Sequence, residues 1–314
     1  MKILVTDGLE AEALTLLRKA HEVRSEELGA AALLEAVTPF HALIVRGRTK
    51  VTAEVIRRGT NLKVIGRAGV GVDNIDVEAA TERKVAVVNA PTASTVSVAE
   101  LAIGHMLSLA RHLPEADRSV KDGKWAKKSL EGRELHGKVL GLLGSGRIGA
   151  EVAKRAQAFG MRVIAYDPYL VPATAEGLGI QLVDKSSLFR QADMISVHAA
   201  LTPETKGLVG AAEFALMKRS AFLVNCARGE IVDEPALLEA LRSGTIAGAA
   251  LDVFSQEPPV RSPLLHAPHL VFTPHLGAST VEAQARAGAV IADQVLKALA
   301  GKRPELLVNP DVYG

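Results

Sequence analysis

Short aliphatic runs alternate with helix-like segments along almost the whole chain, and this alternation limits the possible folds more than any other feature. In the first part, the helical patterns lie at Ala11–Ala20, Ala30–Ala36 and Ala53–Arg57. Strand–helix–strand alternation predicts a parallel sheet with helices on both faces, because parallel neighbours must be joined by a crossover connection. The runs that we interpret as buried strands are Ile3–Thr6, Ala42–Val45, Val64–Gly66 and Val85–Asn89.

The second part of the chain repeats this pattern. Helical patterns occur there at Ile148–Phe159, Ala211–Met217 and Pro235–Arg242. Aromatic residues make up only 4% of the chain, so the cores must be aliphatic. The strands are too many for one compact sheet, so we expect an α/β protein with two doubly wound, Rossmann-like parallel-sheet domains. The six further strands are Val139–Leu143, Val163–Tyr166, Met194–His198, Phe222–Asn225, Gly248–Val253 and Leu270–Thr273.

Two longer helical stretches are candidates for the connections between the domains. One follows Pro91 and covers roughly Val96–Arg111. The other follows the N-cap sequence Ser279–Thr280 and covers Val281–Ala300. If both cross between domains, the C-terminal helix returns to the first domain, which is then discontinuous. Periodicity alone does not require this return.

Charge and composition argue against several classes of protein. The net charge is +2 and the basic residues are scattered, so we expect neither nucleic acid nor a membrane as a partner. The one cysteine, Cys226, cannot form an internal disulfide, and no metal site is expected. The most apolar stretch, Thr95–Leu109, contains Glu100 and His105 and is too short to span a bilayer. Because the N-terminus has no signal-peptide pattern, we expect a soluble protein of the reducing cytoplasm.

Residues 138–149 read KVLGLLGSGRIG, an aliphatic strand followed by a G-x-G-x-x-G turn and an amphipathic helix. Gly144 would allow the tight turn, Gly146 the approach of a pyrophosphate to the backbone, and Gly149 the close packing of helix and strand. The helix N-terminus offers N–H groups and a partial positive charge to the phosphates. The pattern predicts a dinucleotide site, although such a glycine motif is common on its own.

An acidic residue follows the next strand, where dinucleotide-binding domains use one. Asp167 stands 18 residues after Gly149 and would bind the ribose hydroxyls of adenosine. It would also repel a 2′-phosphate, and no arginine follows it, so NAD is favoured over NADP. The alternative interpretation is a turn residue before Pro168. Arg147 either contacts the pyrophosphate or is a solvated helix residue.

Hydride transfer between NAD and a hydroxy acid needs a group that exchanges the hydroxyl proton and a cation that holds the carboxylate. His275 suits proton exchange because imidazole titrates near neutral pH, and Glu257 would fix its tautomer. Arg228 offers a planar fork of donors to a carboxylate. All three follow predicted strands, at the edge where open α/β sheets bind ligands. Taken singly, they could equally be a loop histidine, a turn residue and a surface ion-pair partner.

Other titratable residues fit this chemistry less well. His198 ends a strand and could line a cofactor cleft, but it has no nearby Arg/Glu set, and His105 lies on an apolar helix and is interpreted as structural. Cys226 lies two residues from Arg228 without a base to activate it, so a packed thiol is expected. The remaining histidines are interpreted as surface residues: His21, His41, His112, His136, His266 and His269.

The ordered set of motifs resembles that of the D-isomer-specific 2-hydroxyacid dehydrogenases, and within that family the branch that oxidises 3-phosphoglycerate. The similarity covers nearly the whole chain and is therefore far more specific than the glycine motif. The motifs are GRAGVGVDNID (66–76), KDGKW (121–125), GLLGSGRIG (141–149), VNCARGEIVDE (224–234), AALDVFSQEPP (249–259) and PHLGAST (274–280).

The resemblance implies a domain plan and a catalytic set, which would consist of Arg228, Glu257 and His275. Residues 1–91 and 281–314 would form a discontinuous, flavodoxin-like substrate-binding domain, and residues 92–280 the NAD-binding Rossmann domain. A homodimer through the Val96–Lys128 region is also implied. Besides the motif glycines, Arg147 and Asp167, the residues expected to contact NAD are Ile148, Ala227, Asp252, Gly277 and Ala278.

Substrate binding is expected to involve the glycine-rich loop after the strand Val64–Gly66. Its backbone N–H groups can cradle a carboxylate, a role that the resemblance gives to Val70 and Gly71. The resemblance assigns the substrate's phosphate to three cations, which could otherwise be solvated surface residues: Arg46, Arg67 and Lys127. The lysine would reach across the dimer. Relatives often have arginine there, and lysine keeps the charge but not the planar fork.

These expectations describe an NAD-dependent enzyme that oxidises 3-phosphoglycerate to 3-phosphohydroxypyruvate, the entry to serine synthesis. Thr92-Ala93-Ser94 stands where some relatives have Asn-Gly-Asn, so sister activities on glyoxylate, hydroxypyruvate or D-lactate stay open. A non-enzymatic alternative is an NAD-sensing, corepressor-like binding protein, although the partner-binding extension that this would need is not apparent. The chain ends soon after the returning helix, so no C-terminal regulatory domain, and no serine feedback through one, is expected.

Overall fold

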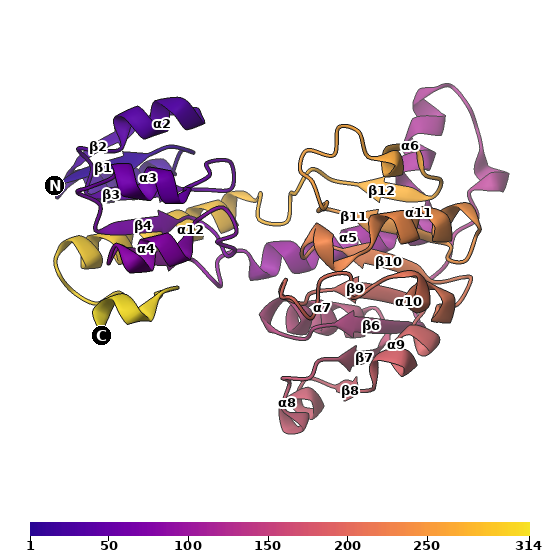
Figure 1. The fold of residues 1–314 in the computed structure, drawn as a ribbon. Coiled ribbons are helices and arrows are strands. Elements are labelled where there is room, and N and C mark those ends of the chain that lie inside the picture. The colour runs from indigo at the N-terminus through magenta and orange to yellow at the C-terminus, as the bar shows by residue number, and fades with distance from the viewer. The chain divides into compact units, whose positions relative to one another are not determined.

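The computed structural model describes all 314 residues, which fold into two compact units. Unit 1 contains Met1–Ser94 together with Ala278–Gly314, and unit 2 contains Thr95–Gly277. Within unit 1, the C-terminal helix drawn in yellow lies against the sheet formed by the indigo and purple N-terminal strands (Figure 1). The prediction of a discontinuous first domain is therefore confirmed.

Unit 1 is built on a five-stranded parallel sheet with the flavodoxin-like order β2-β1-β3-β4-β5. Its strands are β1 (Lys2–Val5), β2 (Glu22–Ser25), β3 (Ala42–Val45), β4 (Val64–Arg67) and β5 (Ala86–Asn89). Two apolar clusters cover its two faces, one with α1 (Ala11–Arg18) and α12 (Val281–Leu299), the other with α2 (Ala30–Ala36), α3 (Ala53–Arg58) and α4 (Val77–Glu82). The last turn of this unit is the 3₁₀ helix η4 (Pro310–Tyr313).

The strands of unit 1 show which elements the sequence pattern can reveal. All four residues of β3 are buried, because helices cover the sheet on both sides. In contrast, β2 has the sequence EVRS with no buried residue, and it pairs with β1 at the sheet edge from Lys2↔Glu22 onward. This exposed edge strand carries no aliphatic run, so its sequence does not predict a strand.

Unit 2 contains a seven-stranded parallel sheet with the order β12-β11-β10-β9-β6-β7-β8. Counted from β6, this is the Rossmann order 3-2-1-4-5-6 with one strand added at the edge. The winding direction reverses between β6 and β9, and such switch points are where open α/β sheets bind ligands. The strands are β6 (Val139–Leu143), β7 (Arg162–Tyr166), β8 (Ile180–Leu182), β9 (Met194–Val197), β10 (Phe222–Asn225), β11 (Gly248–Leu251) and β12 (Leu270–Phe272).

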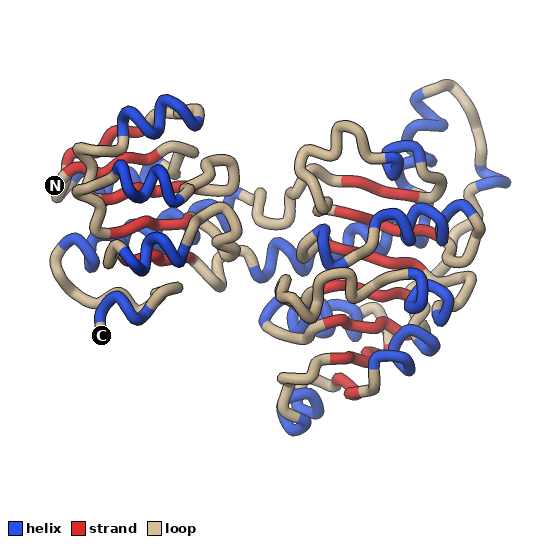
Figure 2. The backbone as a smooth tube through the Cα atoms, in the orientation of Figure 1, coloured by secondary structure: helices blue, strands red, loops and turns tan.

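Helices lie on both sides of this second sheet (Figure 2). The helices of unit 2 are α5 (Thr95–Arg111), α6 (Leu113–Lys121), α7 (Arg147–Ala158), α8 (Pro172–Gly177), α9 (Lys185–Gln191), α10 (Ala211–Leu216) and α11 (Glu234–Arg242). Three 3₁₀ turns complete the unit: η1 (Lys127–Ser129), η2 (Gly229–Ile231) and η3 (Pro263–His266). None of the helices in the protein combines the length and the apolar character that a bilayer crossing requires.

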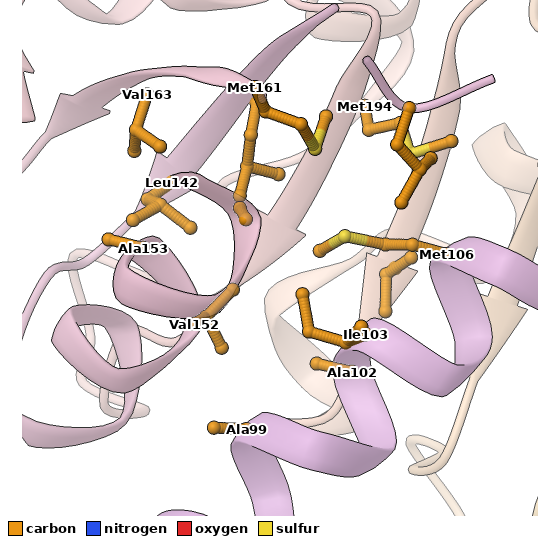
Figure 3. Close-up of a cluster of buried hydrophobic side chains, with 14 of the residues drawn as sticks. Ala99, Ala102, Ile103, Met106, Leu142, Val152, Ala153, Met161, Val163 and Met194 are labelled. Atoms are coloured by element: carbon orange, nitrogen blue, oxygen red, sulfur yellow. The ribbon is translucent and has the colours of Figure 1, made fainter. Parts of the chain in front are cut away.

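Helix α5 is fixed by an apolar stripe that faces α7 and the sheet (Figure 3). Small side chains at Ala99 and Ala102 leave room for α7, and Met106 is fully buried. The stripe follows the helical period, since residues three and four apart share one face. Burial of this stripe holds α5, and with it the buried His105, against the sheet that carries the candidate site.

Candidate active site

The glycine-rich turn between β6 and α7 has the geometry that a dinucleotide requires. Gly144 has a φ of 85°, and a Cβ there would lie 2.7 Å from the backbone nitrogen of Ala199, at the end of the neighbouring β9. A Cβ on Gly149 would lie 2.6 Å from the Gly144 carbonyl oxygen, so glycine lets α7 pack onto the turn. Gly146, the N-cap of α7, has open space where its Cβ would be, which leaves the backbone accessible to a pyrophosphate.

Asp167, directly after β7, is tied to the same turn. Its Oδ2 accepts a hydrogen bond from the Ser145 backbone N–H at 2.7 Å, and its Oδ1 accepts one from the Tyr169 N–H at 2.9 Å. A carboxylate has about four acceptor positions, so the two oxygens can still receive ribose hydroxyls. Arg147 is exposed in the first turn of α7, and Ile148 beside it is partly buried against the core.

His275 and Glu257 form a hydrogen-bonded pair at the carboxyl edge of unit 2. The imidazole Nδ1 lies 2.7 Å from Oε2 of Glu257, while Oε1 of Glu257 accepts from the Phe254 backbone N–H at 3.1 Å. Because an ionised carboxylate only accepts, Nδ1 must carry the proton, which leaves Nε2 as the basic atom of the neutral ring. The side chain of His275 is 50% exposed, so a substrate can reach it.

The pair shifts both pKa values in the sense expected of an ion pair. The hydrogen bond that His275 donates to Glu257 raises the pKa of His275; burial and the charge of Arg228 oppose this, and the charges of Glu257 and Asp252 add to it. Burial acts to raise the pKa of Glu257, but the hydrogen bond and charge of His275, the Phe254 N–H and the Arg228 charge together lower it. The protonated imidazole and the ionised carboxylate are thus both stabilised.

Arg228 comes from the neighbouring strand end, after β10. Its Nη1 donates to the Ala227 carbonyl at 2.7 Å, and the Asn225 side chain donates to the Arg228 carbonyl at 2.9 Å. The next residue, Gly229, allows close packing, since a Cβ there would lie 1.9 Å from the Phe254 carbonyl carbon. This contact brings the Arg228 segment onto the loop that carries Glu257. The structure therefore brings all three expected catalytic residues together within unit 2.

Asp252 is completely buried, and its carboxylate holds the backbone of the His275 loop. Its Oδ1 accepts from the Leu276 N–H at 2.7 Å and its Oδ2 from the Gly277 N–H at 2.8 Å. The His275 N–H donates to the Asp252 carbonyl at 2.8 Å. Ala278, which begins the second segment of unit 1, accepts from the Gln284 side chain at 2.8 Å.

The residues expected to bind the substrate's phosphate are held in several different ways. In unit 1, Arg46 donates from Nη2 to both carboxylate oxygens of Glu10, at 2.6 and 2.8 Å, and from Nε to the Gly8 carbonyl at 3.1 Å. The Arg67 guanidinium folds over Gly69, where a Cβ would lie 1.4 Å from its Nη1. Lys127 is exposed in η1 of unit 2. Sequence reasoning missed Glu10, because nothing in the pattern pairs two residues 36 positions apart.

The loop expected to hold the substrate carboxylate follows β4. The carbonyl of Val70 accepts from the Asn89 side chain at 2.6 Å, which fixes this loop to the end of β5. Val70 and Gly71 are partly exposed, so their backbone is accessible to a ligand.

Two other titratable residues of unit 2, His198 and Cys226, are uncharged at neutral pH. His198 lies below Gly149, with its Cβ 3.8 Å from where a Gly149 Cβ would be, and its Nε2 lies 2.8 Å from the Ser196 hydroxyl. Burial lowers the pKa of His198 to about 4, so the ring is neutral. Burial raises the pKa of the Cys226 thiol well above its usual range, as expected of a packed thiol rather than a nucleophile.

Comparison with known proteins assigns this architecture to a family. Residues 103–277 match the family model described as "D-isomer specific 2-hydroxyacid dehydrogenase, NAD binding domain". The matched segment covers nearly all of unit 2. It includes the glycine-rich turn, Asp167 and all three expected catalytic residues.

Individual relatives extend the similarity over both units. A D-3-phosphoglycerate dehydrogenase of Methanocaldococcus jannaschii is 52% identical over 98% of the chain, but the chain spans only 59% of that relative's length. A hydroxypyruvate reductase of Thermotoga maritima is 48% identical over 95% of the chain and 98% of its own length. A solved structure from Thermus thermophilus superposes with a TM-score of 0.90 at 40% identity, covering 98% of the chain and 100% of its own. The chain therefore belongs to the D-isomer-specific 2-hydroxyacid dehydrogenase family and carries its NAD-binding domain.

Proposed function

We propose that the chain is an NAD-dependent D-2-hydroxyacid dehydrogenase that oxidises 3-phosphoglycerate at C2. The observation that carries this proposal is the 2.7 Å contact between His275 Nδ1 and Glu257, beside Arg228. It supplies an oriented base and a carboxylate-binding cation in the same unit as the glycine-rich turn. Membership of the family supports the reaction class.

In the proposed reaction, Nε2 of His275 takes the hydroxyl proton while its Nδ1–H stays bonded to Glu257. The electron pair of the C2–H bond leaves as hydride, and the C2–O bond becomes a carbonyl. NAD, when bound, accepts that hydride. The Arg228 guanidinium holds the substrate carboxylate and stabilises the developing carbonyl oxygen. The raised pKa of His275 then keeps the proton on the ring, ready for the reverse reduction.

For the cofactor, the fit rests on the nucleotide turn. We propose that Gly144, Gly146, Arg147, Ile148 and Gly149 receive the pyrophosphate and that Asp167 receives the ribose. The open space at Gly146 and the spare acceptor capacity of Asp167 support this. Further contacts are proposed for Ala227, Asp252, Gly277 and Ala278. Because Asp252 is buried, its part is to hold the backbone that faces the cofactor.

For the substrate, we propose that Val70 and Gly71 cradle the carboxylate and that Arg46, Arg67 and Lys127 serve the phosphate. Support comes from relatives that are named D-3-phosphoglycerate dehydrogenase. The Methanocaldococcus protein is one of them, and its sequence is 52% identical to that of the chain. Arg46 is already paired with Glu10, so a phosphate must compete for its guanidinium. This pairing and the Thermotoga relative favour a second candidate, the reduction of hydroxypyruvate or glyoxylate.

A matched pair of acids tests the substrate proposal. Initial rates of NAD reduction are compared for 3-phosphoglycerate and D-glycerate, which differ only in the phosphate. We expect kcat/KM to be at least about tenfold higher for the phosphorylated acid, since one charge-assisted contact is worth that much. Equal values, with faster reduction of hydroxypyruvate, would establish the second candidate. Binding of NADH without turnover of any acid would indicate a sensing protein instead.

Arg46→Gln tests the cation itself. The variant should lower kcat/KM for 3-phosphoglycerate by about tenfold and leave D-glycerate within about threefold, because only the phosphate contact is lost. The matched control is Arg48→Gln, which removes a guanidinium that pairs with Asp7 and Glu27. An equal loss for both acids in Arg46→Gln would mean that Arg46 supports only the fold.

We also propose a homodimer that uses the Val96–Lys128 region. Its support is a set of exposed apolar side chains: Leu113 is 50% exposed, Val120 58% and Trp125 83%. Exposed large apolar groups gathered in one segment are typical of an interaction surface. Light scattering after size exclusion should give twice the mass of the 33.1 kDa chain, and Trp125→Glu should shift it to the monomer.

A further inference from the structure

A buried chain of polar groups lies beneath the His275 loop and begins on helix α5. His105 is 3% exposed, and its Nε2 lies 3.0 Å from the hydroxyl of Thr273. That hydroxyl lies 2.5 Å from Oδ1 of Asp252, which is itself fully buried. All three residues belong to unit 2.

The direction of these hydrogen bonds follows from the chemistry of the groups. An ionised carboxylate can only accept, so the Thr273 hydroxyl donates its one hydrogen bond to Asp252. The hydroxyl oxygen must then accept from His105, which requires the Nε2–H tautomer of that ring. Burial lowers the pKa of His105, so the ring donates this hydrogen bond as a neutral group. The chain therefore runs in one direction, from His105 through Thr273 to Asp252.

At its far end, this chain holds the backbone on which His275 depends. The Asp252 carboxylate accepts hydrogen bonds from the N–H groups of Leu276 and Gly277. The backbone carbonyl of Asp252 accepts one from the His275 N–H. Gly277 favours this close approach, because a Cβ there would make a tight contact, 3.2 Å from Oδ2 of Asp252.

His275 itself has a φ of 54°, in the left-handed region that non-glycine residues rarely adopt. A backbone in that region persists only where its surroundings hold it. Here the His275 N–H donates to the carbonyls of Asp252 and Thr273, and the Asp252 carboxylate holds the next two amides.

We propose that His105 is a positioning residue for His275, acting through Thr273 and Asp252 to fix the loop that presents the imidazole. This inference rests on the proposed function only in what it says about turnover. The geometric part, that His105 orders residues 275–277, stands independently of any activity. The sequence pattern does not indicate this role, because a histidine on an apolar helix is interpreted simply as a structural residue.

Hydrogen exchange in the free protein tests the geometric part. His105→Leu removes the donor and leaves the Thr273 hydroxyl without it. The Leu276 and Gly277 amides should then exchange about tenfold faster, since one buried hydrogen bond is worth roughly that factor. His105→Gln keeps a side-chain N–H donor and should stay within about threefold of wild type. Met106→Leu, on the same helix, controls for disturbed packing and should leave both amides unchanged.

Thr273→Val tests the route and does not depend on the folding of the His105→Leu variant. It removes the relay hydroxyl in a side chain of similar shape, and it should speed exchange of the same two amides about as much as His105→Leu. In the double variant the two effects should not add, because both break one chain. Additive effects, or unchanged amides in His105→Leu or Thr273→Val, would overturn the proposal.

Steady-state kinetics then tests the functional consequence. A displaced imidazole should lower kcat about fivefold to twentyfold in His105→Leu, with KM for NAD and acid within about threefold, and His105→Gln should restore most of the rate. A wild-type protein without dehydrogenase activity would refute the proposed function but not the exchange result. Normal kcat with faster exchange would show that the loop tolerates the movement, and would overturn the positioning role.

Discussion

Each unit pairs a candidate functional side chain with a glutamate carboxylate, but the two pairs have opposite consequences. In unit 2, Glu257 binds the His275 ring through Nδ1 and leaves Nε2 available for chemistry. In unit 1, Glu10 occupies the Arg46 guanidinium with both of its carboxylate oxygens. The first ion pair orients a base, whereas the second must be exchanged before an anion can bind.

This difference indicates how the two functions are encoded. The proposed chemistry depends on contacts within unit 2, where three strand-end loops and a buried carboxylate fix the residues in advance. The proposed substrate choice depends on cations that include Arg46 of unit 1, whose guanidinium a protein carboxylate already neutralises. Reaction class is thus fixed more firmly than substrate, in agreement with relatives that share the family but carry the names of different activities.

The largest effect is expected at the base itself. His275→Gln should lower kcat by about 10²–10⁴-fold, the usual contribution of general acid–base catalysis, because glutamine cannot take the hydroxyl proton. The dissociation constant for NADH, from fluorescence titration, should stay within about threefold, since the nucleotide turn lies elsewhere in unit 2. A rate close to that of wild type would remove His275 from the mechanism and end the contrast between the units.

A smaller effect, on stability, is expected at His198 beneath the nucleotide turn. Its folded pKa of about 4 lies below the ordinary histidine value of about 6.5, so between these values only the unfolded chain binds the proton. Unfolding free energy is therefore lost as pH falls through this window, by about 2–3 kcal/mol at pH 4.5. His198→Asn should reduce the difference in unfolding free energy between pH 8 and pH 4.5 by that amount, measured by urea denaturation. An unchanged difference would mean that the ring is solvated rather than buried.

The smallest effect is expected at the ribose contact. Asp167→Asn keeps one oxygen that can accept the Ser145 N–H, but it loses the charge and the acceptor for the Tyr169 N–H. We expect KM for NAD to rise about tenfold and the preference over NADP to shrink, because repulsion of a 2′-phosphate is lost. The ratio of kcat/KM for NAD to kcat/KM for NADP measures this preference. The chemical step at His275 is the same with both cofactors, so it does not affect the ratio. If the ratio did not change, Asp167 would serve only to fix the turn.

The parts of the fold that sequence could predict are those where burial forces a continuous pattern. Buried strands such as β3 and β10 and the glycine-rich turn were predicted because every residue in them is constrained. The edge strands β2 and β8 were not, because neither EVRS nor IQL is a continuous aliphatic run. The short helices α4, α6, α8 and α9 were also missed, because sequences such as LPEADRSVK and KSSLFRQ are largely polar and show no clear apolar period.

The site shows the same limit. Sequence could propose His275, Glu257 and Arg228 because each follows a strand, and their expected roles rest on the family resemblance. It could not give the Glu10 partner of Arg46, or the relay from His105 to Asp252. These contacts join residues 21 to 168 positions apart, and only the folded sheets bring them together.

The pH dependence of oxidation tests the central claim, that Glu257 sets the proton affinity of His275. In the wild type, kcat/KM should rise with pH through a midpoint above 6.5, because the base must be deprotonated and its pKa is raised. Glu257→Gln keeps an acceptor for Nδ1–H but removes the charge, so the midpoint should move to lower pH. Glu234→Gln, which alters a carboxylate that binds Ser255 in the same loop, should leave it unchanged. The same midpoint in wild type and Glu257→Gln would contradict the account.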